Sequence, residues 1–494
     1  MEFSRSKTSG HTTFEQLIDH ENPDLGTFSQ RFWWSDEYWA GPGSPVVFFT
    51  PGEIAADGYT GYLTNRTVTG LFAEAIGGAV VMLEHRYWGE SSPYDELTTK
   101  NLQYLTLANS IADTTYFAKN VVLPFDTNGS SSATNAPWVF SGGSYSGALS
   151  AWTASVDPGT FWAYHASSAV VQTVYDFWQY FEPVQAGMPQ NCSSDVSLVV
   201  DYMDSILVNG TAAQKKALKT KFGLDGLADA DFGAALENGP WLWQSNQFYS
   251  GYSDFYIFCD YIEGIYTNTT TNSTPSATGV GLTAALENYA QWTKEYLIPD
   301  YCASYGYWTD PTTLACFDTY NASSPLFTDV TVSNVVDRQW NWFLCNEPFA
   351  YWQDGAPATT PSLVSRLVDA AYWQRQCDLF FPPEGDYTYG SASGKTVEDV
   401  NTWTGGWDMN TTRLIWTNGE FDPWRDSTVS SDYRPQGPLA STVEAPVQVI
   451  PAGIHCSDLL AENGEVNEGV QAVIDNEVAQ IKAWVEEWPA YKRR

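Results

Sequence analysis

Continuous apolar runs, bounded by glycine or polar loops, recur towards both ends of the chain. They cover residues 44–49, 79–83, 138–141, 412–416 and 447–451. Apolar runs of this length without alternation predict strands that are buried on both faces. Apolar residues at three- and four-residue spacing predict helices between residues 100 and 122 and along the C-terminal segment. This alternation of strand and helix predicts an α/β fold with a mostly parallel sheet.

The pattern changes after about residue 172, where cysteines appear and helix-like stretches replace the strands. These stretches cover residues 196–207, 212–222, 282–296 and 363–377. Strand-like runs return only near residue 412. We therefore interpret 173–395 as a helical cap, stapled by disulfides, that is inserted between two segments of a sheet domain, 1–172 and 396–494. Residues 1–43 are polar and aromatic and show no clear period.

A glycine-rich turn at residues 141–147, which read Ser-Gly-Gly-Ser-Tyr-Ser-Gly, joins a predicted strand to a helix-compatible stretch. Strand, tight turn, serine and helix are the setting of a nucleophile elbow, which exposes a serine hydroxyl, here Ser144, at the edge of a sheet. N–H groups at the helix start lie near the developing oxyanion. The motif is G-x-S-x-S, because Ser146 replaces the second glycine, and by itself it is more typical of an ordinary loop.

Two later loops contain the other residue types that an activated serine needs. Asp422 and His455 each follow a predicted buried strand, so the chain order is Ser, Asp, His, as in α/β-hydrolases. An imidazole takes the serine proton, and a carboxylate fixes the tautomer of the imidazole. Asp426 and Asp458 are rival carboxylates, but Asp422 lies directly after its strand. We therefore predict Ser144 as nucleophile, His455 as base and Asp422 as orienting acid.

Other polar residues near strand ends leave several interpretations open. The loop that contains Glu53 is either a simple turn or the source of a second oxyanion N–H, and Glu53 is a candidate to bind a substrate amine or carboxyl group. His85 precedes the serine, and we interpret it as structural, beside an expected ion pair between Glu84 and Arg86. His165 is the other histidine beyond the elbow, and we expect it in the strand or loop after the elbow helix.

Charge and composition narrow the class of protein. The 494 residues include 23 Lys and Arg against 58 Asp and Glu, which gives a formal charge of −35, while 43% are apolar and 15% aromatic. This is a globular, core-forming composition, and its acidic surface argues against nucleic acid or membrane partners. No apolar run approaches the ~18 residues of a membrane span. Because self-repulsion falls when carboxylates are protonated, we expect acidic surroundings, with a halophile-like surface as the alternative.

Sequons and cysteines favour a secreted, disulfide-containing glycoprotein. The N-x-S/T sequons lie at Asn65, Asn128, Asn191, Asn209, Asn268, Asn272, Asn321 and Asn410. The seven cysteines are Cys192, Cys259, Cys302, Cys316, Cys345, Cys377 and Cys456, none with C-x-x-C spacing. We predict no metal and no cofactor. Our preferred pairs are Cys302–Cys316 and Cys345–Cys377, with Cys192 and Cys259 completing three bridges and Cys456 left over, although six cysteines allow 15 connectivities.

Four motifs together resemble one known family. They are EHRYWGES at 84–91, GGSY at 142–145, NGEFDPW at 418–424 and HCSDL at 455–459. They resemble the serine-peptidase family of lysosomal Pro-Xaa carboxypeptidase and dipeptidyl peptidase II, and over nearly its full length the chain is similar to the fungal acid prolyl endoproteases of that family. The resemblance implies an α/β-hydrolase domain with a helical cap, cleavage after proline, an acidic working range, and the roles given above to Ser144, Asp422 and His455. It also implies that Tyr145, as the residue after the nucleophile, supplies one oxyanion N–H. The chain departs from the family at Ser146, where several relatives have glycine, and at Cys456, where a second histidine is frequent.

We therefore expect a secreted serine peptidase, monomeric or homodimeric, that cleaves proline-containing peptides endo-wise at acidic pH. Trp424 and Tyr145 are the candidates to line an apolar slot for the proline ring, although core packing is an equal interpretation of Trp424. Asp422 should raise the pKa of His455, and we expect burial under the cap to offset this. The rival functions are a proline-specific exopeptidase of the same family, a carboxylesterase, and a catalytically silent adhesion-type hydrolase fold.

Overall fold

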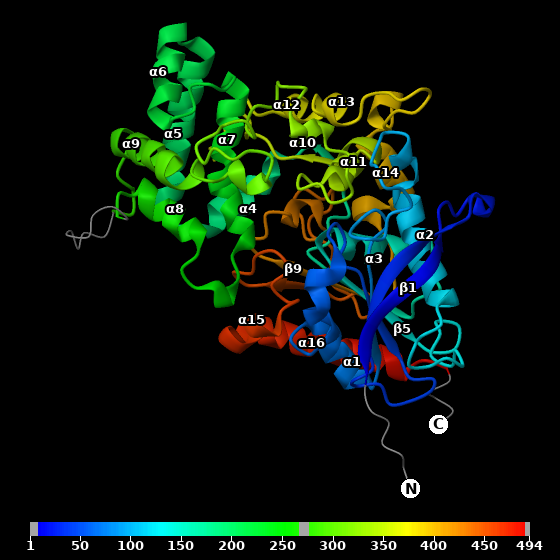
Figure 1. Ribbon diagram of the computed structural model, residues 1–494. Helices are drawn as coiled ribbons and strands as arrows, with labels where there is room; N and C mark the ends of the chain where they lie inside the picture. The colour runs from blue at the N-terminus through cyan, green and yellow to red at the C-terminus, as the bar shows by residue number, and fades with distance from the viewer. Residues whose placement is uncertain (1–7, 266–275, 490–494) are drawn as a thin grey trace. The chain divides into compact units, whose positions relative to one another are not determined.

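The chain folds as two compact units (Figure 1). The computed structural model describes residues 8–265 and 276–489. Unit 1 comprises Met1–Thr173, Val330–Phe349 and Pro383–Arg494, and unit 2 comprises Val174–Asp329 and Ala350–Pro382. Unit 2 begins at Val174, and the predicted cap begins at residue 173. Two stretches of the predicted cap, 330–349 and 383–395, group with the sheet unit instead.

Unit 1 is built on an eight-stranded sheet with the order β1-β2-β4-β3-β5-β6-β9-β10. The strands are β1 (Ser9–Leu17), β2 (Thr27–Ser35), β3 (Val46–Phe49), β4 (Ala79–Leu83), β5 (Trp138–Gly143), β6 (Ala163–Ser167), β9 (Leu414–Gly419) and β10 (Val447–Ile450). Pairing is antiparallel for β1 with β2 and for β2 with β4, and parallel from β4 to β10. The N-terminal strands, blue in Figure 1, and the C-terminal segment, orange to red, belong to the same unit. The topology is that of an α/β-hydrolase.

All five predicted strands are present in this sheet, and β6, where a strand or loop was left open, is a strand, but β1 and β2 were not predicted. Both lie in the segment that showed no clear period. They form an antiparallel pair from Ser9↔Ser35 to Leu17↔Thr27. Along β1 most side chains are exposed, whereas β2 is buried at six of nine positions because it pairs with β4 on its other side. Neither strand therefore has the simple apolar alternation that marks a half-buried strand.

Helices cover both faces of this sheet. Those of unit 1 are α1 (Val68–Ile76), α2 (Leu107–Asn120), α3 (Ser144–Val156), α11 (Arg338–Asn346), α14 (Val397–Thr404), α15 (Ala461–Val466) and α16 (Glu468–Glu486). Phe72 of α1 and Trp484 of α16 share one core cluster with Phe49. On the opposite face Phe117 of α2 packs against Phe48, with ring centroids 5.9 Å apart. Alternate side chains of β3 thus point into two different cores.

Unit 2 is mainly helical, as predicted for the middle of the chain. Its elements are β7 (Val174–Asp176), α4 (Phe181–Gly187), α5 (Gln190–Asn209), α6 (Ala212–Phe222), α7 (Asp229–Trp241), α8 (Asp254–Ile262), α9 (Leu282–Trp292), α10 (Pro325–Thr328), β8 (Ala350–Trp352), α12 (Ala370–Gln374) and α13 (Cys377–Phe380). The predicted helix over 363–377 is wrong in its first half. Asp204 of α5 accepts hydrogen bonds from Ser365 Oγ at 2.5 Å and from Arg366 N at 3.0 Å, which hold that backbone in a turn.

Two disulfides, Cys192–Cys259 and Cys302–Cys316, lie within unit 2, and both match the predicted pairs. Cys345 and Cys377 are also disulfide-bonded, and Cys456 is a free thiol. Five sequon asparagines are exposed, at Asn65, Asn128, Asn209, Asn321 and Asn410. Asn191 is partly buried in the first turn of α5, and Asn268 and Asn272 lie outside the described residues.

Candidate active site

Ser144 lies at the turn from β5 into α3, and its backbone is strained. Its φ is +57°, a left-handed conformation that costs a residue with a Cβ atom about 1–2 kcal/mol. Close packing explains the glycines around it. A methyl group on Gly142 would lie 2.2 Å from Ser146 O, and one on Gly147 would lie 2.7 Å from Ser167 O. This strained, glycine-lined turn has the geometry of a nucleophile elbow.

Ser146, which replaces the second glycine of the motif, has a structural partner of its own. Its hydroxyl donates a 2.6 Å hydrogen bond to Thr50 O, in the loop after β3. In the same loop Gly52 has a φ of +77°, and a methyl group there would lie 3.3 Å from Tyr145 Cδ1. The loop of Glu53 therefore lies directly against the start of α3, where an oxyanion N–H is needed.

Asp422 and His455 meet at the carboxyl ends of β9 and β10. His455 Nδ1 is 2.9 Å from Asp422 Oδ1, and because a carboxylate only accepts, the imidazole donates this hydrogen bond. The same oxygen accepts from Trp424 N at 3.0 Å. The two rival carboxylates are engaged elsewhere: Asp426 accepts from Ser431 Oγ and Asp458 from Ser167 Oγ. Of the three candidates, Asp422 is the one hydrogen-bonded to the histidine.

The loop between β10 and α15, residues 451–460, carries His455 and is called the histidine loop; it lies beside the turn of Ser144. A methyl group on Gly143, which precedes Ser144, would lie 2.5 Å from Leu459 Cδ1 and 3.0 Å from Cys456 Sγ. Cys456 follows His455 directly in the chain. The loop is also tied to β6, since Cys456 N donates to Ser168 Oγ at 2.9 Å. Three loops that are far apart in the sequence thus place Ser144, Asp422 and His455 at one edge of the sheet.

The pKa of His455 lies well above its ordinary value. Burial of the ring lowers this pKa, but the neighbouring Cys456 and Asp422 outweigh burial. We expected burial to offset the carboxylate, and this expectation is wrong for the structure as it stands.

Tyr145 and His85 form a buried hydrogen-bonded pair. His85 Nδ1 is 2.9 Å from Arg86 O, which can only accept, so Nδ1 carries the proton and Nε2 accepts from the Tyr145 hydroxyl at 2.9 Å. Burial lowers the pKa of His85 to about 4, which keeps its imidazole neutral. The Tyr145 side chain is 0% exposed. Its ring therefore has no free surface for a substrate, while its backbone N–H remains at the start of α3.

The expected ion pair between Glu84 and Arg86 is absent from the structure. Glu84 instead binds Arg31 of β2 at 2.7 Å, and Arg86 binds Asp113 of α2 at 2.5 Å. Both residues lie beyond Leu83, the last residue of β4, and each finds its partner on a different element. Both ion pairs, Glu84 with Arg31 and Arg86 with Asp113, hold the loop that contains His85.

Aromatic residues in and just after α11 pack against Tyr145, and the sequence did not predict this contact. The ring centroid of Tyr145 lies 5.4 Å from those of Trp340 and Phe343 and 6.1 Å from that of Phe349. Trp340 keeps part of its surface exposed. Asp337 precedes this helix in a left-handed conformation, with a φ of +50°. Nothing in the local pattern of residues 337–349 indicates that they pack against a helix almost 200 residues earlier in the chain.

Two carboxyl groups, that of Glu53 near His455 and that of Asp337 near Glu53, have raised pKa values. Burial raises the pKa of Glu53 to about 7, although nearby His455 lowers it. Burial, together with the charge of Glu53, raises the pKa of Asp337 to about 7, although Asp337 accepts a hydrogen bond from Trp88 Nε1 at 3.1 Å. Both groups are therefore neutral in acid and become negative as the pH rises through about 7.

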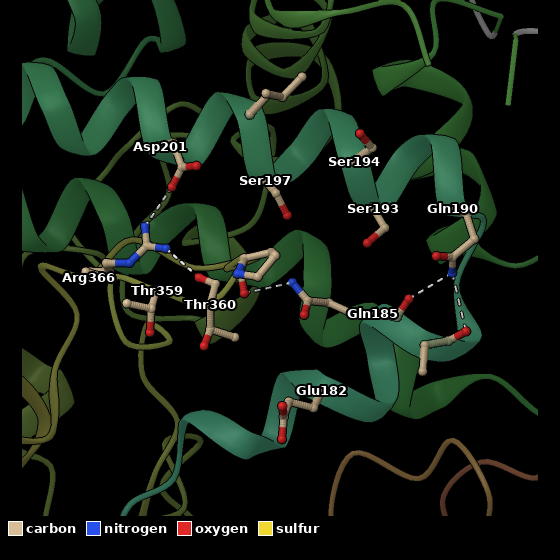
Figure 2. A pocket seen from close by; sticks show the side chains of 14 residues that line it. Glu182, Gln185, Gln190, Ser193, Ser194, Ser197, Asp201, Thr359, Thr360 and Arg366 are labelled. Atoms are coloured by element: carbon tan, nitrogen blue, oxygen red, sulfur yellow. Dashed lines mark hydrogen bonds and ion pairs between the residues drawn. The ribbon is translucent and has the colours of Figure 1, made fainter. Parts of the chain in front are cut away.

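A separate hollow of about 700 Å³ lies in unit 2, between α4, α5 and the loop near residue 360 (Figure 2). Asp201 and Arg366 form an ion pair there at 2.9 Å, and Gln185 Nε2 donates to Pro361 O at 3.2 Å. Polar and apolar residues both line it, and none of the predicted catalytic residues is among them.

A search of the helices in residues 8–265 and 276–489 for a membrane-spanning segment finds none of sufficient length and hydrophobicity.

Comparison with protein families matches residues 16–473 to the family described as serine carboxypeptidase S28. The chain belongs to this family. The S28 chain is 43% identical over 483 residues to the serine protease vicPb of Bipolaris victoriae (strain FI3), which covers 97% of this chain and 90% of that protein. It is 30% identical over 499 residues to a probable extracellular serine carboxypeptidase of Arthroderma benhamiae, with 96% and 66% covered.

Among solved structures, the S28 chain is similar to a proline iminopeptidase of Mycobacterium smegmatis. The identity is 11% and the TM-score 0.35, with 96% of this chain and 99% of that chain covered. Family membership and the α/β-hydrolase topology together identify the S28 chain as a serine peptidase.

Proposed function

We propose that this serine peptidase cleaves peptide bonds on the carboxyl side of proline through an acyl-enzyme. The observation that carries the proposal is the 2.9 Å hydrogen bond from His455 Nδ1 to Asp422 Oδ1, in a loop that adjoins the strained turn of Ser144. With Nδ1 held as the donor, Nε2 of His455 is the atom that accepts a proton from Ser144 Oγ.

The reaction then follows from the proposed roles. Ser144 Oγ attacks the carbonyl carbon while His455 takes its proton, and the oxyanion accepts a hydrogen bond from Tyr145 N. Asp422 stabilises the imidazolium, which gives the proton to the leaving amine. Water, deprotonated by His455, attacks the ester carbon and releases Ser144.

Specificity for proline is supported by the aromatic groups around the elbow. A proline ring favours an apolar slot with aromatic walls. Trp340 is partly exposed beside Tyr145, and Trp424 is partly exposed with its ring centroid 6.4 Å from that of His455. We place the slot between these groups and reserve Tyr145 for its N–H. A lysosomal Pro-X carboxypeptidase of Pongo abelii is 31% identical over 182 residues, which is 35% of this chain.

The best test is a panel of peptides at acid pH. A peptide with a blocked N-terminus and a chromophoric amide after proline should be cleaved, and its alanine counterpart should be cleaved at least ~100-fold more slowly if the slot selects the ring. A peptide blocked at both ends with an internal proline tests endo action. Equal rates for proline, alanine and simple esters would contradict proline specificity and favour a carboxylesterase.

An exopeptidase of the same family is the second candidate, and Glu53 and Asp337 favour it. Ionised carboxylates on Glu53, near His455, and on Asp337, near Glu53, would attract the free amino group of a peptide. In acid both carboxyls are neutral, as their raised pKa values of about 7 imply. A peptide with a blocked N-terminus does not depend on this attraction. Cleavage confined to peptides with a free amino terminus, and lost on acetylation, would establish the exopeptidase.

We predict that kcat/KM for the blocked prolyl peptide falls as the pH rises through about 7. Glu53 and Asp337 lose their protons over this range and leave partly buried negative charge near the proposed site. Because the folded pKa of Glu53 is raised, its contribution to stability is also present in acid and is lost as the pH rises towards 7. Glu53→Gln should keep the acid activity and reduce the size of this loss, and the step that remains from Asp337 should move to lower pH, because the charge of Glu53 no longer raises the pKa of Asp337. Glu74→Gln, on α1, is the control, and an unchanged profile in Glu53→Gln would contradict the assignment.

Secretion, glycosylation and an acidic environment belong to the same proposal. The exposed sequons, the disulfides and the charge of −35 support them, as does the relative named as extracellular. We propose proline-containing peptides as the partners of the site and a monomer or homodimer as the assembly. Glycosidase treatment of protein from a secreting fungal host, followed by peptide mapping, tests occupancy at each exposed asparagine.

A further inference from the structure

A buried cluster of three ionisable residues lies outside the proposed triad. His165 on β6, Asp458 in the histidine loop and Glu477 on α16 have 0%, 1% and 0% of their surfaces exposed. His165 Nε2 is 3.3 Å from Asp458 Oδ2 and 3.4 Å from Glu477 Oε1. Asp458 follows His455 by three residues, so one end of this cluster belongs to the loop that carries the proposed base.

Hydroxyl groups from the sheet complete the cluster. Ser141 Oγ lies 3.0 Å from His165 Nδ1, Ser167 Oγ donates to Asp458 Oδ1 at 2.6 Å, and Thr417 Oγ1 donates to Glu477 Oε1. The ring of Phe72, from α1, meets the imidazole edge-on at 5.3 Å. The charged groups that face His165 are thus the two carboxylates, one from the histidine loop and one from α16.

We propose that His165 is a positioning residue which, as an imidazolium, fastens the loop of His455 to β6 and α16. This role rests on the proposed function of His455 as the base. The loop is held to β6 at two points, through Cys456 N to Ser168 Oγ and through Asp458 to Ser167 and His165. Without the cation, two buried carboxylates would face each other and displace the loop. A displacement of about 1 Å in a catalytic group can cost 10²-fold in rate.

The charges of the cluster favour the acid form of the protein. One imidazolium and two carboxylates leave one excess negative charge, which a proton on Glu477 would remove. Burial raises the pKa of Glu477, against the effect of His165. Burial lowers the pKa of His165, but Glu477 and Asp458 raise it to about 10. Both folded values are raised, so both contributions to stability are present in acid. The contribution of Glu477 to stability is lost as the pH rises above 4.5, the ordinary pKa of a glutamate. The contribution of His165 is lost as the pH rises towards its folded pKa of about 10.

The test uses the full chain and four variants: His165→Gln, Glu477→Gln, the double variant, and His11→Gln on exposed β1 as the control. We expect His165→Gln to lower kcat for the prolyl peptide about 10²-fold with little change in KM. The double variant, which also removes one carboxylate, should recover part of this loss. Glu477→Gln should keep kcat and reduce the fall in thermal midpoint between pH 5 and 8. ¹⁵N NMR of the wild-type histidines should show His165 as an imidazolium at pH 7.

Several outcomes would overturn the proposal. They are a neutral His165 at pH 7, a stoichiometric metal ion bound by the cluster in the purified protein, or a kcat of His165→Gln equal to that of His11→Gln. The NMR measurement and the pH dependence of the thermal midpoint of Glu477→Gln test the proposal even where His165→Gln does not fold. Retained activity in Ser144→Ala would instead refute the proposed function, and the imidazolium state of His165 would still be measurable.

Discussion

Replacing Ser144 with alanine should lower kcat for the blocked prolyl peptide by about 10⁶-fold, which is the loss typical of removing a triad nucleophile. Alanine retains the Cβ atom, so the left-handed backbone at φ +57° is no more strained than in the native chain. The loss should therefore come from the missing hydroxyl and leave the thermal midpoint close to that of the native protein. Steady-state kinetics and thermal unfolding of the purified variant measure both.

Ser150→Ala is the matched control, because Ser150 lies on the same helix and donates to Phe140 O at 3.0 Å. It should retain activity within a few fold. Ser144→Gly should be inactive like Ser144→Ala yet about 1 kcal/mol more stable, since glycine accepts positive φ without strain. Substantial activity in Ser144→Ala would mean that another residue forms the acyl-enzyme and would contradict the proposed mechanism.

Asp422→Asn should lower kcat by about 10⁴-fold while KM changes little. An amide at this position can donate to His455 Nδ1, which then holds the imidazole in the tautomer that presents Nε2–H to the serine. The 2.9 Å contact between Asp422 Oδ1 and His455 Nδ1 makes this exchange of roles direct. The loss of the carboxylate should also lower the pKa of His455, because Asp422 is one of the groups that raise it.

Asp426→Asn provides the control for this charge change, since Asp426 lies four residues further along and accepts from Ser431 Oγ. We expect it to stay within about tenfold of the native kcat, as for the loss of a single structural hydrogen bond. Comparable losses in both variants would mean that this loop acts only as structure. A loss in Asp426→Asn alone would transfer the role of orienting acid to Asp426.

Much of the sheet could be predicted, because buried parallel strands are marked by local composition. The runs at 79–83 and 447–451 became β4 (Ala79–Leu83) and β10 (Val447–Ile450) with almost no change in their ends. The wrong helix prediction over 363–377 has a different cause. The segment 363–368 is amphipathic enough for a helix, but Asp204 accepts hydrogen bonds from the Ser365 side chain and the Arg366 backbone. Hydrogen bonds from a distant element thus override local propensity.

The chemistry of the site was readable for a similar reason. Each predicted residue follows a strand, and the carboxyl ends of parallel strands meet at one edge, so Ser144, Asp422 and His455 could be grouped without coordinates. The choice between Asp422 and its rivals rested on a difference of four residues. The structure adds a hydrogen bond from His455 to one carboxylate and gives the others different partners.

The sequence by itself determined the α/β-hydrolase sheet, the residue types of the triad and the acidity of the surface, because each depends on neighbours in the chain or on totals. Only the tertiary structure decided which groups surround them. Trp340 of α11 packs against Tyr145, Asp337 lies near Glu53, and Glu84 and Arg86 take separate partners. His165 meets Asp458 and Glu477 across three elements. Such contacts depend on packing between distant segments, which the local order of residues does not encode.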